Sequence, residues 1–173
     1  MGFHQMILGS PENHFLTHKK VGFYFFVNNF MTKIDFFSNA PNRLDYVARL
    51  LNKVHSSGQT AVVFGAAPAL AQLSDALWQA KSFLAHEQLD ADVGEAIVAP
   101  IVLTSVALLN FPHHDVLINL TDELPAFFAQ FHRLIEVVPN EEQPRQAARE
   151  RWQHYKSRGY VMKHHDIAAK AKP

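Results

Sequence analysis

The sequence predicts an α/β protein in three layers, with a mainly parallel sheet of about five strands between helices. Short apolar segments alternate along the chain with longer amphipathic segments, which is typical of α/β folds. Apolar residues make up 48% of the chain and charged residues 18%, as expected for a globular protein. With 173 residues, the chain is long enough for one domain with a substantial core.

Five segments have the composition of strands. The first, KIDFFS, follows an irregular N-terminal region. The second, TAVVFG, is a short and continuous apolar run, which is typical of a central parallel strand buried on both faces. The predicted strands are residues 33–38, 60–65, 100–106, 115–121 and 133–139.

The segments between these strands have helical periodicity. In residues 42–58, Leu44, Val47, Leu51 and Val54 recur at spacings of three and four, so they would share one face of a helix. A proline precedes this segment and a glycine ends it, as is common at helix starts and stops. The other predicted helices are residues 68–81, the brief segment 124–131 and residues 142–158.

The chain is expected to hold one domain with a further segment at each end. Residues 1–30 lack clear periodicity, and their basic pair and short apolar run have no signal-peptide cleavage site. Two explanations stay open for them, a disordered extension or a start assigned upstream of Met31. Residues 31–160 are the predicted α/β domain, and residues 161–173 are a predicted polar tail.

The composition excludes several classes of function. The chain has no cysteine, so it has no disulfide, no thiolate nucleophile and no cysteine-bound metal. This fits a reducing compartment, and we expect a cytoplasmic protein. No apolar run reaches the length of about 18 residues that indicates a transmembrane helix.

Many α/β sheets bind nucleotides through a glycine-rich loop, whose backbone N–H groups contact the phosphates. The segment FGAAPALA after the second predicted strand has one glycine and no phosphate-loop pattern. The adjacent His113 and His114 would point to opposite faces of a strand, and the acidic segment 90–95 lacks the ligand spacing of a calcium loop. We therefore expect a nucleotide-binding-like fold without a phosphate loop, and no catalytic site, cofactor or metal.

The net charge of zero conceals an uneven distribution along the chain. Residues 82–142 carry ten acidic residues and one basic residue, a net charge of −9. Residues 143–173 carry eight basic and two acidic residues, a net charge of +6. The basic character is thus concentrated at the C-terminal end.

The segment AARERWQHYKSRGY combines basic and aromatic residues. On a helix, Arg145, Arg149, Trp152 and Lys156 share one face, because they are four, three and four residues apart. Residues 145–158 hold five basic residues and one acidic residue, a net charge of +4. Aliphatic stems beside an aromatic ring can contact apolar and anionic groups together.

Three interpretations of this face remain open from spacing alone. It could bind single-stranded nucleic acid, with bases stacked on the aromatic rings. It could bind an acidic peptide with a large apolar side chain and a free C-terminal carboxylate. Alternatively, Trp152 belongs to the core and the arginines form an ordinary solvated surface. The segment with a charge of −9 favours the peptide over a long polyanion, which it would repel.

Several segments together resemble one protein family. FHRLIEVVP followed by AARERWQHYKSRGYVMKHH resembles the C-terminal signature of the chi subunit of bacterial DNA polymerase III. LSDALWQAKSFLAH and KIDFFS are also similar to segments of that family. The resemblance covers roughly residues 31–166 and leaves residues 1–30 unmatched.

The resemblance implies a non-catalytic adaptor in DNA replication. Chi subunits join the clamp-loader complex, usually through the psi subunit. They bind the acidic C-terminal tail of the single-stranded-DNA-binding protein, which ends in apolar residues and a free carboxylate. The alternative is a direct single-stranded nucleic-acid-binding module that uses the basic aromatic helix. The surface that faces psi cannot be placed from the sequence.

The resemblance also implies roles for individual residues. Arg149 would bind the terminal carboxylate of the tail, and Arg145 its aspartates. Trp78 and Phe83 would line the pocket for the terminal phenylalanine. Gln153 stands where some relatives carry a lysine. The expected tail-binding residues are Arg145, Arg149, Trp152, Gln153, Lys156, Trp78 and Phe83.

Overall fold

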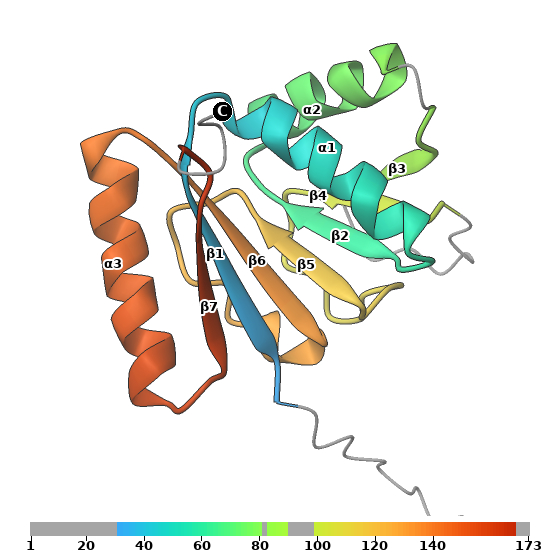
Figure 1. Cartoon of the computed structure of the whole chain (residues 1–173). Helices are drawn as coiled ribbons and strands as arrows, with labels where there is room; N and C mark the ends of the chain where they lie inside the picture. The colour runs from blue at the N-terminus through green and yellow to red at the C-terminus, as the bar shows by residue number, and fades with distance from the viewer. Residues whose placement is uncertain (1–30, 81–82, 90–98, 169–173) are drawn as a thin grey trace, which may run out of the picture.

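The computed structural model describes residues 31–80, 83–89 and 99–168 (Figure 1). The expectations for residues 1–30 and for the acidic segment 90–95 lie outside these residues. The described residues form a seven-stranded sheet with helices on both faces. This confirms the predicted α/β class.

All strands of the sheet are parallel, in the order β3-β4-β2-β5-β6-β1-β7. Their bounds are β1 (Lys33–Ala40), β2 (Ala61–Phe64), β3 (His86–Leu89), β4 (Ile101–Thr104), β5 (Val116–Asn119), β6 (Arg133–Pro139) and β7 (Met162–Asp166). The prediction of about five strands was too low. The two additional strands, β3 and β7, are the edges of the sheet, and β7 lies within the segment that we expected to be a polar tail.

The helices are α1 (Arg43–Ser56), α2 (Ala67–Gln79) and α3 (Glu142–Ser157), with a short 3-10 helix η1 (Phe128–Gln130). Asn42 caps the N-terminus of helix α1, because its side chain accepts a hydrogen bond from the backbone N–H of Asp45 at 3.2 Å. It ends before Gly58, which has a φ of 74° that suits glycine. Helix α2 has Pro68 in its first turn, where the missing N–H costs no hydrogen bond.

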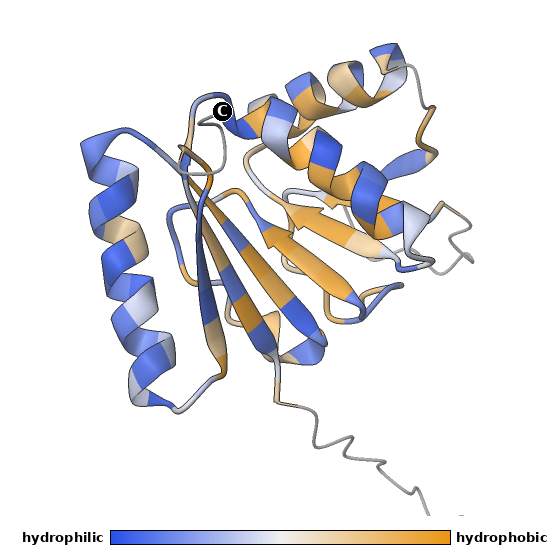
Figure 2. Cartoon of the chain, in the orientation of Figure 1, coloured by the Kyte–Doolittle hydropathy of each residue, from blue (hydrophilic) through white to orange (hydrophobic). Residues whose placement is uncertain are grey.

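The central strands are buried on both faces and separate two apolar clusters. In β2, Ala61 and Val63 belong to the cluster beneath α1 and α2, whereas Val62 belongs to the cluster beneath α3 and η1. This alternation follows from the period of two along a strand. Figure 2 shows the hydrophobic central strands and the hydrophilic β7. Along the described residues, no helix combines the length and apolarity needed to cross a bilayer.

Helix α3 leads from β6 to β7, which pairs with β1 at the edge of the sheet. The strand β7 places Lys163 and His165 opposite Asp35 and Phe37 of β1, and His164 opposite Phe36. Because neighbouring residues of a strand point to opposite faces, His164 faces α3 and His165 faces the side of α1. The edge strand β7 therefore presents polar side chains on both faces of the sheet.

Candidate peptide-binding cleft

Helix α3 packs on the sheet through Ala148, Arg151 and Tyr155, which are buried. Their spacing of three and four residues defines the inner face of the helix. Arg149 and Trp152 lie beside this face, so they border the sheet without being part of the core. Trp152 is half-buried, which is intermediate between the core position and the exposed position considered from the sequence.

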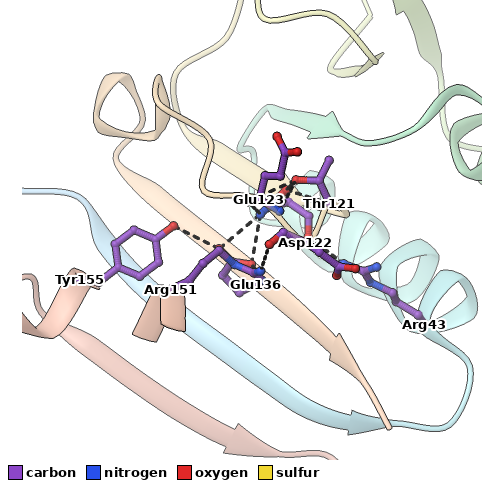
Figure 3. A network of polar contacts seen from close by, with 8 residues as sticks. Arg43, Thr121, Asp122, Glu123, Glu136, Arg151 and Tyr155 are labelled. Carbon is purple, nitrogen blue, oxygen red and sulfur yellow. Dashed lines mark hydrogen bonds and ion pairs between the residues drawn. The ribbon is translucent and has the colours of Figure 1, made fainter. Parts of the chain in front are cut away.

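The inner face of α3 contains a buried polar network (Figure 3). Arg151 contacts Glu136 through two nitrogens, with Nη2 3.0 Å from Oε2 and Nε 3.1 Å from Oε1. Tyr155 donates a hydrogen bond to the same carboxylate at 3.1 Å, and Asn119 donates to both of its oxygens. Arg151 also donates to the backbone carbonyl of Asp122. From the sequence alone, Arg151 counts among the basic residues of the helix surface. Its charge is instead paired with Glu136 in the interior of the protein.

Burial dominates the electrostatics of this network. It raises the pKa of the Glu136 carboxyl, against the opposite effects of Arg151 and of the hydrogen bonds from Asn119 and Tyr155. Burial, followed by the neighbouring Glu136, also raises the pKa of the Tyr155 hydroxyl. Tyr155 therefore keeps its proton and donates to Glu136 at neutral pH. The network fixes α3 to β6.

A cleft of about 340 Å³ opens between α3, β1 and β7. We call it the α3 cleft. Its apolar lining comes from Phe36, Val138 and Ala148, and the ring of Trp152 meets that of Phe36 edge-on at a centroid distance of 5.0 Å. The complete lining is Phe36, Ser38, Asn39, Val138, Arg145, Ala148, Arg149, Trp152, Gln153 and His164. Four of the seven expected tail-binding residues, Arg145, Arg149, Trp152 and Gln153, thus meet in one cleft.

The side chains of the two arginines of the α3 cleft are partly exposed, that of Arg145 to 41%. Arg149 Nη1 lies 3.3 Å from Glu142 Oε1 and 3.3 Å from Gln146 Oε1, and Arg145 Nη1 lies 3.9 Å from Glu142 Oε2. The side chain of Glu142 is 75% exposed and that of Arg149 58%. Exposed ion pairs of this kind stabilise a protein by at most about 1 kcal/mol. A carboxylate of a ligand can therefore compete with Glu142 for both arginines.

The opposite wall of the cleft was not predicted from the sequence. Ser38 Oγ lies 2.8 Å from His164 Nε2, and Asn39 Nδ2 donates to Asp166 Oδ1 at 3.0 Å. Asn39 has a φ of 59°, a left-handed conformation that asparagine tolerates better than most residues. The role of His164 was missed because we expected the segment that contains it to be a polar tail. The segment forms strand β7, and the alternation of side chains along that strand places His164 on the side of the cleft.

The remaining expected residues do not join the cleft. Trp78 lies by the β3 edge of the sheet, because its ring contacts those of His86 in β3 and of Phe83. Strand β7 is the other edge of the sheet (Figure 1). Trp78 and Phe83 therefore do not line the α3 cleft together with Arg149. The positions of Trp78 and Phe83 in the sequence do not indicate which edge of the sheet carries them. Lys156 is exposed on α3 beyond the residues that line the cleft.

No group of three or more acidic or histidine side chains is arranged to hold a metal ion among the residues that the structure describes. The α3 cleft instead combines an apolar floor, two guanidinium groups and hydrogen-bonding groups on one open surface. Such a surface suits an extended ligand with both an apolar and an anionic part.

Comparison with known proteins gives the family. A sequence model described as "DNA polymerase III chi subunit, HolC" matches residues 31–163, well over half of the chain. The chain belongs to this family. The DNA polymerase III subunit chi of Pseudomonas aeruginosa is 32% identical over 147 residues, which cover 79% of this chain and 98% of that protein. The family match confirms the resemblance seen in the sequence and assigns this chi-family chain an accessory role in DNA replication.

Proposed function

We propose that this chi-family chain is a non-catalytic, cytoplasmic adaptor that holds the acidic C-terminal tail of the single-stranded-DNA-binding protein in the α3 cleft. The observation that carries the proposal is the presence of Arg145, Arg149 and Trp152 around one apolar floor. An acidic peptide that ends in an apolar residue and a free carboxylate has the matching chemistry. The adaptor joins this tail to the clamp loader through the psi subunit.

In this proposal the two parts of the tail occupy different parts of the cleft. The terminal apolar side chain packs against Phe36, Val138 and Trp152. Arg149 exchanges Glu142 for the terminal carboxylate, and Arg145 contacts an aspartate upstream in the tail. Most of these contacts are exposed and charge-assisted, so we expect a micromolar affinity, or about −8 kcal/mol, that falls steeply with added salt.

An adaptor needs a second surface, and the aromatic pair at the far edge supplies one. The side chains of Trp78 and Phe83 are 52% and 64% exposed, and their rings lie 5.0 Å apart between centroids. The ring of Trp78 also contacts His86, at 4.7 Å. Exposed aromatic groups of this kind are typical centres of protein–protein interfaces. We assign this pair to the contact with psi, and the sheet keeps it apart from the α3 cleft.

The proposal is tested by fluorescence anisotropy with a labelled acidic peptide that ends in phenylalanine with a free carboxylate. The control is the same peptide with a C-terminal amide. We expect binding of the free acid and a loss of binding on amidation, because the amide removes the charge that Arg149 contacts. Equal binding of both peptides would contradict recognition of the terminal carboxylate by the cleft.

A matched experiment tests the alternative that α3 binds single-stranded nucleic acid. In that case, bases would stack on Trp152 and change its fluorescence. A Trp78→Phe background leaves Trp152 as the single tryptophan of the chain. Quenching of Trp152 by an oligonucleotide, with no response to the acidic peptide, would replace the peptide proposal by the nucleic-acid alternative.

A further inference from the structure

A second hollowed surface lies on the opposite face of the sheet. One cleft of about 650 Å³ is formed at the beginnings of β1, β6 and β7, and another of about 510 Å³ lies between α1 and the sheet. The two clefts adjoin, because Gln59 and Arg133 line both of them. We call the combined surface the α1 groove.

The pleat of the strands places the α1 groove on the face away from the α3 cleft. Phe37 packs into the cluster beneath α1, whereas Phe36 packs into the cluster beneath α3. On β7, His165 lines the groove and its neighbour His164 lines the α3 cleft. Apart from Ile34 at the start of β1, which belongs to the cluster beneath α3, the residues named here place the groove on the α1 side, and the two surfaces share no lining residue.

The α1 groove is strongly basic. Lys33, Arg133 and Lys163 line it from the sheet, and Arg49 and Lys53 line it from α1. Lys33, Lys163, Arg49 and Lys53 are exposed.

The acidic residue among those that line the two clefts is Asp35, which is buried. Asp35 Oδ2 accepts a hydrogen bond from Arg133 Nε at 2.7 Å, and its Oδ1 lies 2.7 Å from His165 Nε2. Five basic side chains against one carboxylate leave an excess of four positive charges with the histidines neutral. A further carboxylate, Asp115, lies 3.7 Å from His132 at the rim and is held by Thr60.

Aromatic rings lie between these cations. The ring of Phe37 stacks on His165 at a centroid distance of 4.5 Å, and it contacts Tyr46 at 5.5 Å. The guanidinium of Arg49 lies over the ring of Tyr46, 5.7 Å from its centroid. Tyr46 and His165 line the groove and are half-buried.

We propose that the α1 groove binds the backbone of single-stranded DNA without sequence preference. Cations on two walls fit a ligand that repeats its negative charge along its length, and aromatic faces between them accept bases by stacking. A peptide of acidic residues alone, such as polyglutamate, would satisfy the cations but would gain nothing from the rings. This site is independent of the proposed tail binding, since it lies on the other face of the sheet and shares no lining residue with the α3 cleft.

The charge pattern of the sequence concealed this groove. Its basic residues come from β1, α1, β6 and β7, so no segment of the chain carries them together. Of the ten acidic residues of segment 82–142, Glu136 is buried against Arg151 and does not face a ligand. The net charge of a segment is therefore a poor guide to the potential in a groove that several elements build.

The test is fluorescence anisotropy of the full chain with a labelled oligothymidylate of about 16 nucleotides at several salt concentrations. We compare the wild type with Lys33→Ala/Lys163→Ala and with Arg49→Ala/Lys53→Ala, one double variant for each wall. We expect each to weaken binding about tenfold at low salt. Each should also reduce the slope of log K against log salt by about 1.4, because a single-strand phosphate contact contributes about 0.7.

The matched control is Arg145→Ala/Arg149→Ala, which removes the same number of charges from the α3 cleft. This variant should bind the oligonucleotide as the wild type does and lose the acidic peptide, whereas the two groove variants should keep the peptide. In the Trp78→Phe background, Trp152 emission should stay unchanged as the oligonucleotide binds.

Four outcomes would overturn the proposal. An equal effect of all three double variants would indicate a response to total charge, and an effect of the control variant alone would place the DNA on α3. Displacement of the oligonucleotide by polyglutamate of equal charge, as efficiently as by unlabelled DNA, would make the groove a general polyanion site. Absence of binding by the folded protein at low salt would remove the site altogether.

Discussion

Arg151 and Glu136 form an ion pair in the interior, with Arg151 Nη2 3.0 Å from Glu136 Oε2, and both side chains are almost completely buried. The pair joins α3 to β6, and Tyr155 of the same helix donates to the same carboxylate. Arg149, two residues before Arg151, lines the α3 cleft. The position of the cleft arginines over β1 and β7 thus depends on a buried ion pair that does not itself contact the proposed ligand.

Arg151→Ala should lower the free energy of unfolding by about 3–5 kcal/mol, because it leaves the carboxylate of Glu136 buried without its partner. Urea unfolding followed by circular dichroism measures the change. Arg149→Ala is the matched control, since it removes an exposed arginine of the same helix and should change stability by no more than about 0.5 kcal/mol. Equal effects of the two substitutions would show that the buried pair has no special role in stability.

Arg149→Ala should weaken binding of the free-acid peptide by about tenfold or more. A hydrogen bond to a charged group contributes about 1.5–3 kcal/mol, and each 1.4 kcal/mol is about a factor of ten. Peptide titration by anisotropy measures the loss. Lys156→Ala is the control, because Lys156 is exposed on the same helix and does not line the cleft. If Lys156→Ala lowered the peptide affinity by as much, the peptide would be attracted by the overall charge of the helix rather than bound through a contact between Arg149 and its carboxylate.

Gln153→Lys should strengthen peptide binding by a few fold. Gln153 lines the α3 cleft and is exposed, so a lysine there would add a positive charge beside an acidic ligand. Exposed ion pairs contribute about 0.2–1 kcal/mol, which sets the size of the gain. The gain should disappear at high salt, and a gain that persists there would have a cause other than the added charge.

The sequence predicted the central part of the fold because the central strands contain short runs of apolar residues. The two strands that it missed are the polar edge strands, HEQL of β3 and MKHHD of β7. An edge strand has one face or one side in water, so its sequence needs no apolar run. Its position depends on pairing with another strand, which for β7 is β1 at the other end of the domain, and local periodicity carries no information on that pairing.

The candidate site was predictable to the extent that one helix builds it. The grouping of Arg145, Arg149 and Trp152 follows from the helical period, and the structure places all three in one cleft. The contribution of His164 depends on β7 and was missed with it. The separation of Trp78 from Arg149 follows from the strand order, which the order of elements along the chain does not determine.

Trp78→Ala and Phe83→Ala should leave peptide binding unchanged and should weaken binding to psi by about 2 kcal/mol or more each, as expected for aromatic hot spots. Isothermal titration with purified psi and with the free-acid peptide measures the two affinities on the same protein samples. Arg149→Ala should show the opposite pattern. Loss of peptide binding in the two aromatic variants, with the fold intact, would contradict the assignment of separate surfaces.

Asp115 should give the protein a defined dependence of stability on acid pH. Its Oδ2 accepts hydrogen bonds from the backbone N–H of Thr60 at 2.9 Å and from the Thr60 hydroxyl at 2.8 Å. The backbone hydrogen bond, with smaller contributions from the hydroxyl and from His132, lowers the pKa of the Asp115 carboxyl below its ordinary value, against the effect of partial burial.

Between the lowered pKa of Asp115 and its value of about 3.9 in the unfolded chain, the unfolded state binds more protons than the folded state. The stabilisation is therefore complete above the unfolded-state pKa and is lost as the pH falls through the folded-state pKa. Asp115→Asn should accordingly be less stable than the wild type at neutral pH. Urea unfolding of both proteins at a series of pH values should show this difference shrinking below about pH 4. A difference that stays constant over that range would mean that Asp115 acts through packing and hydrogen-bond geometry rather than through its charge.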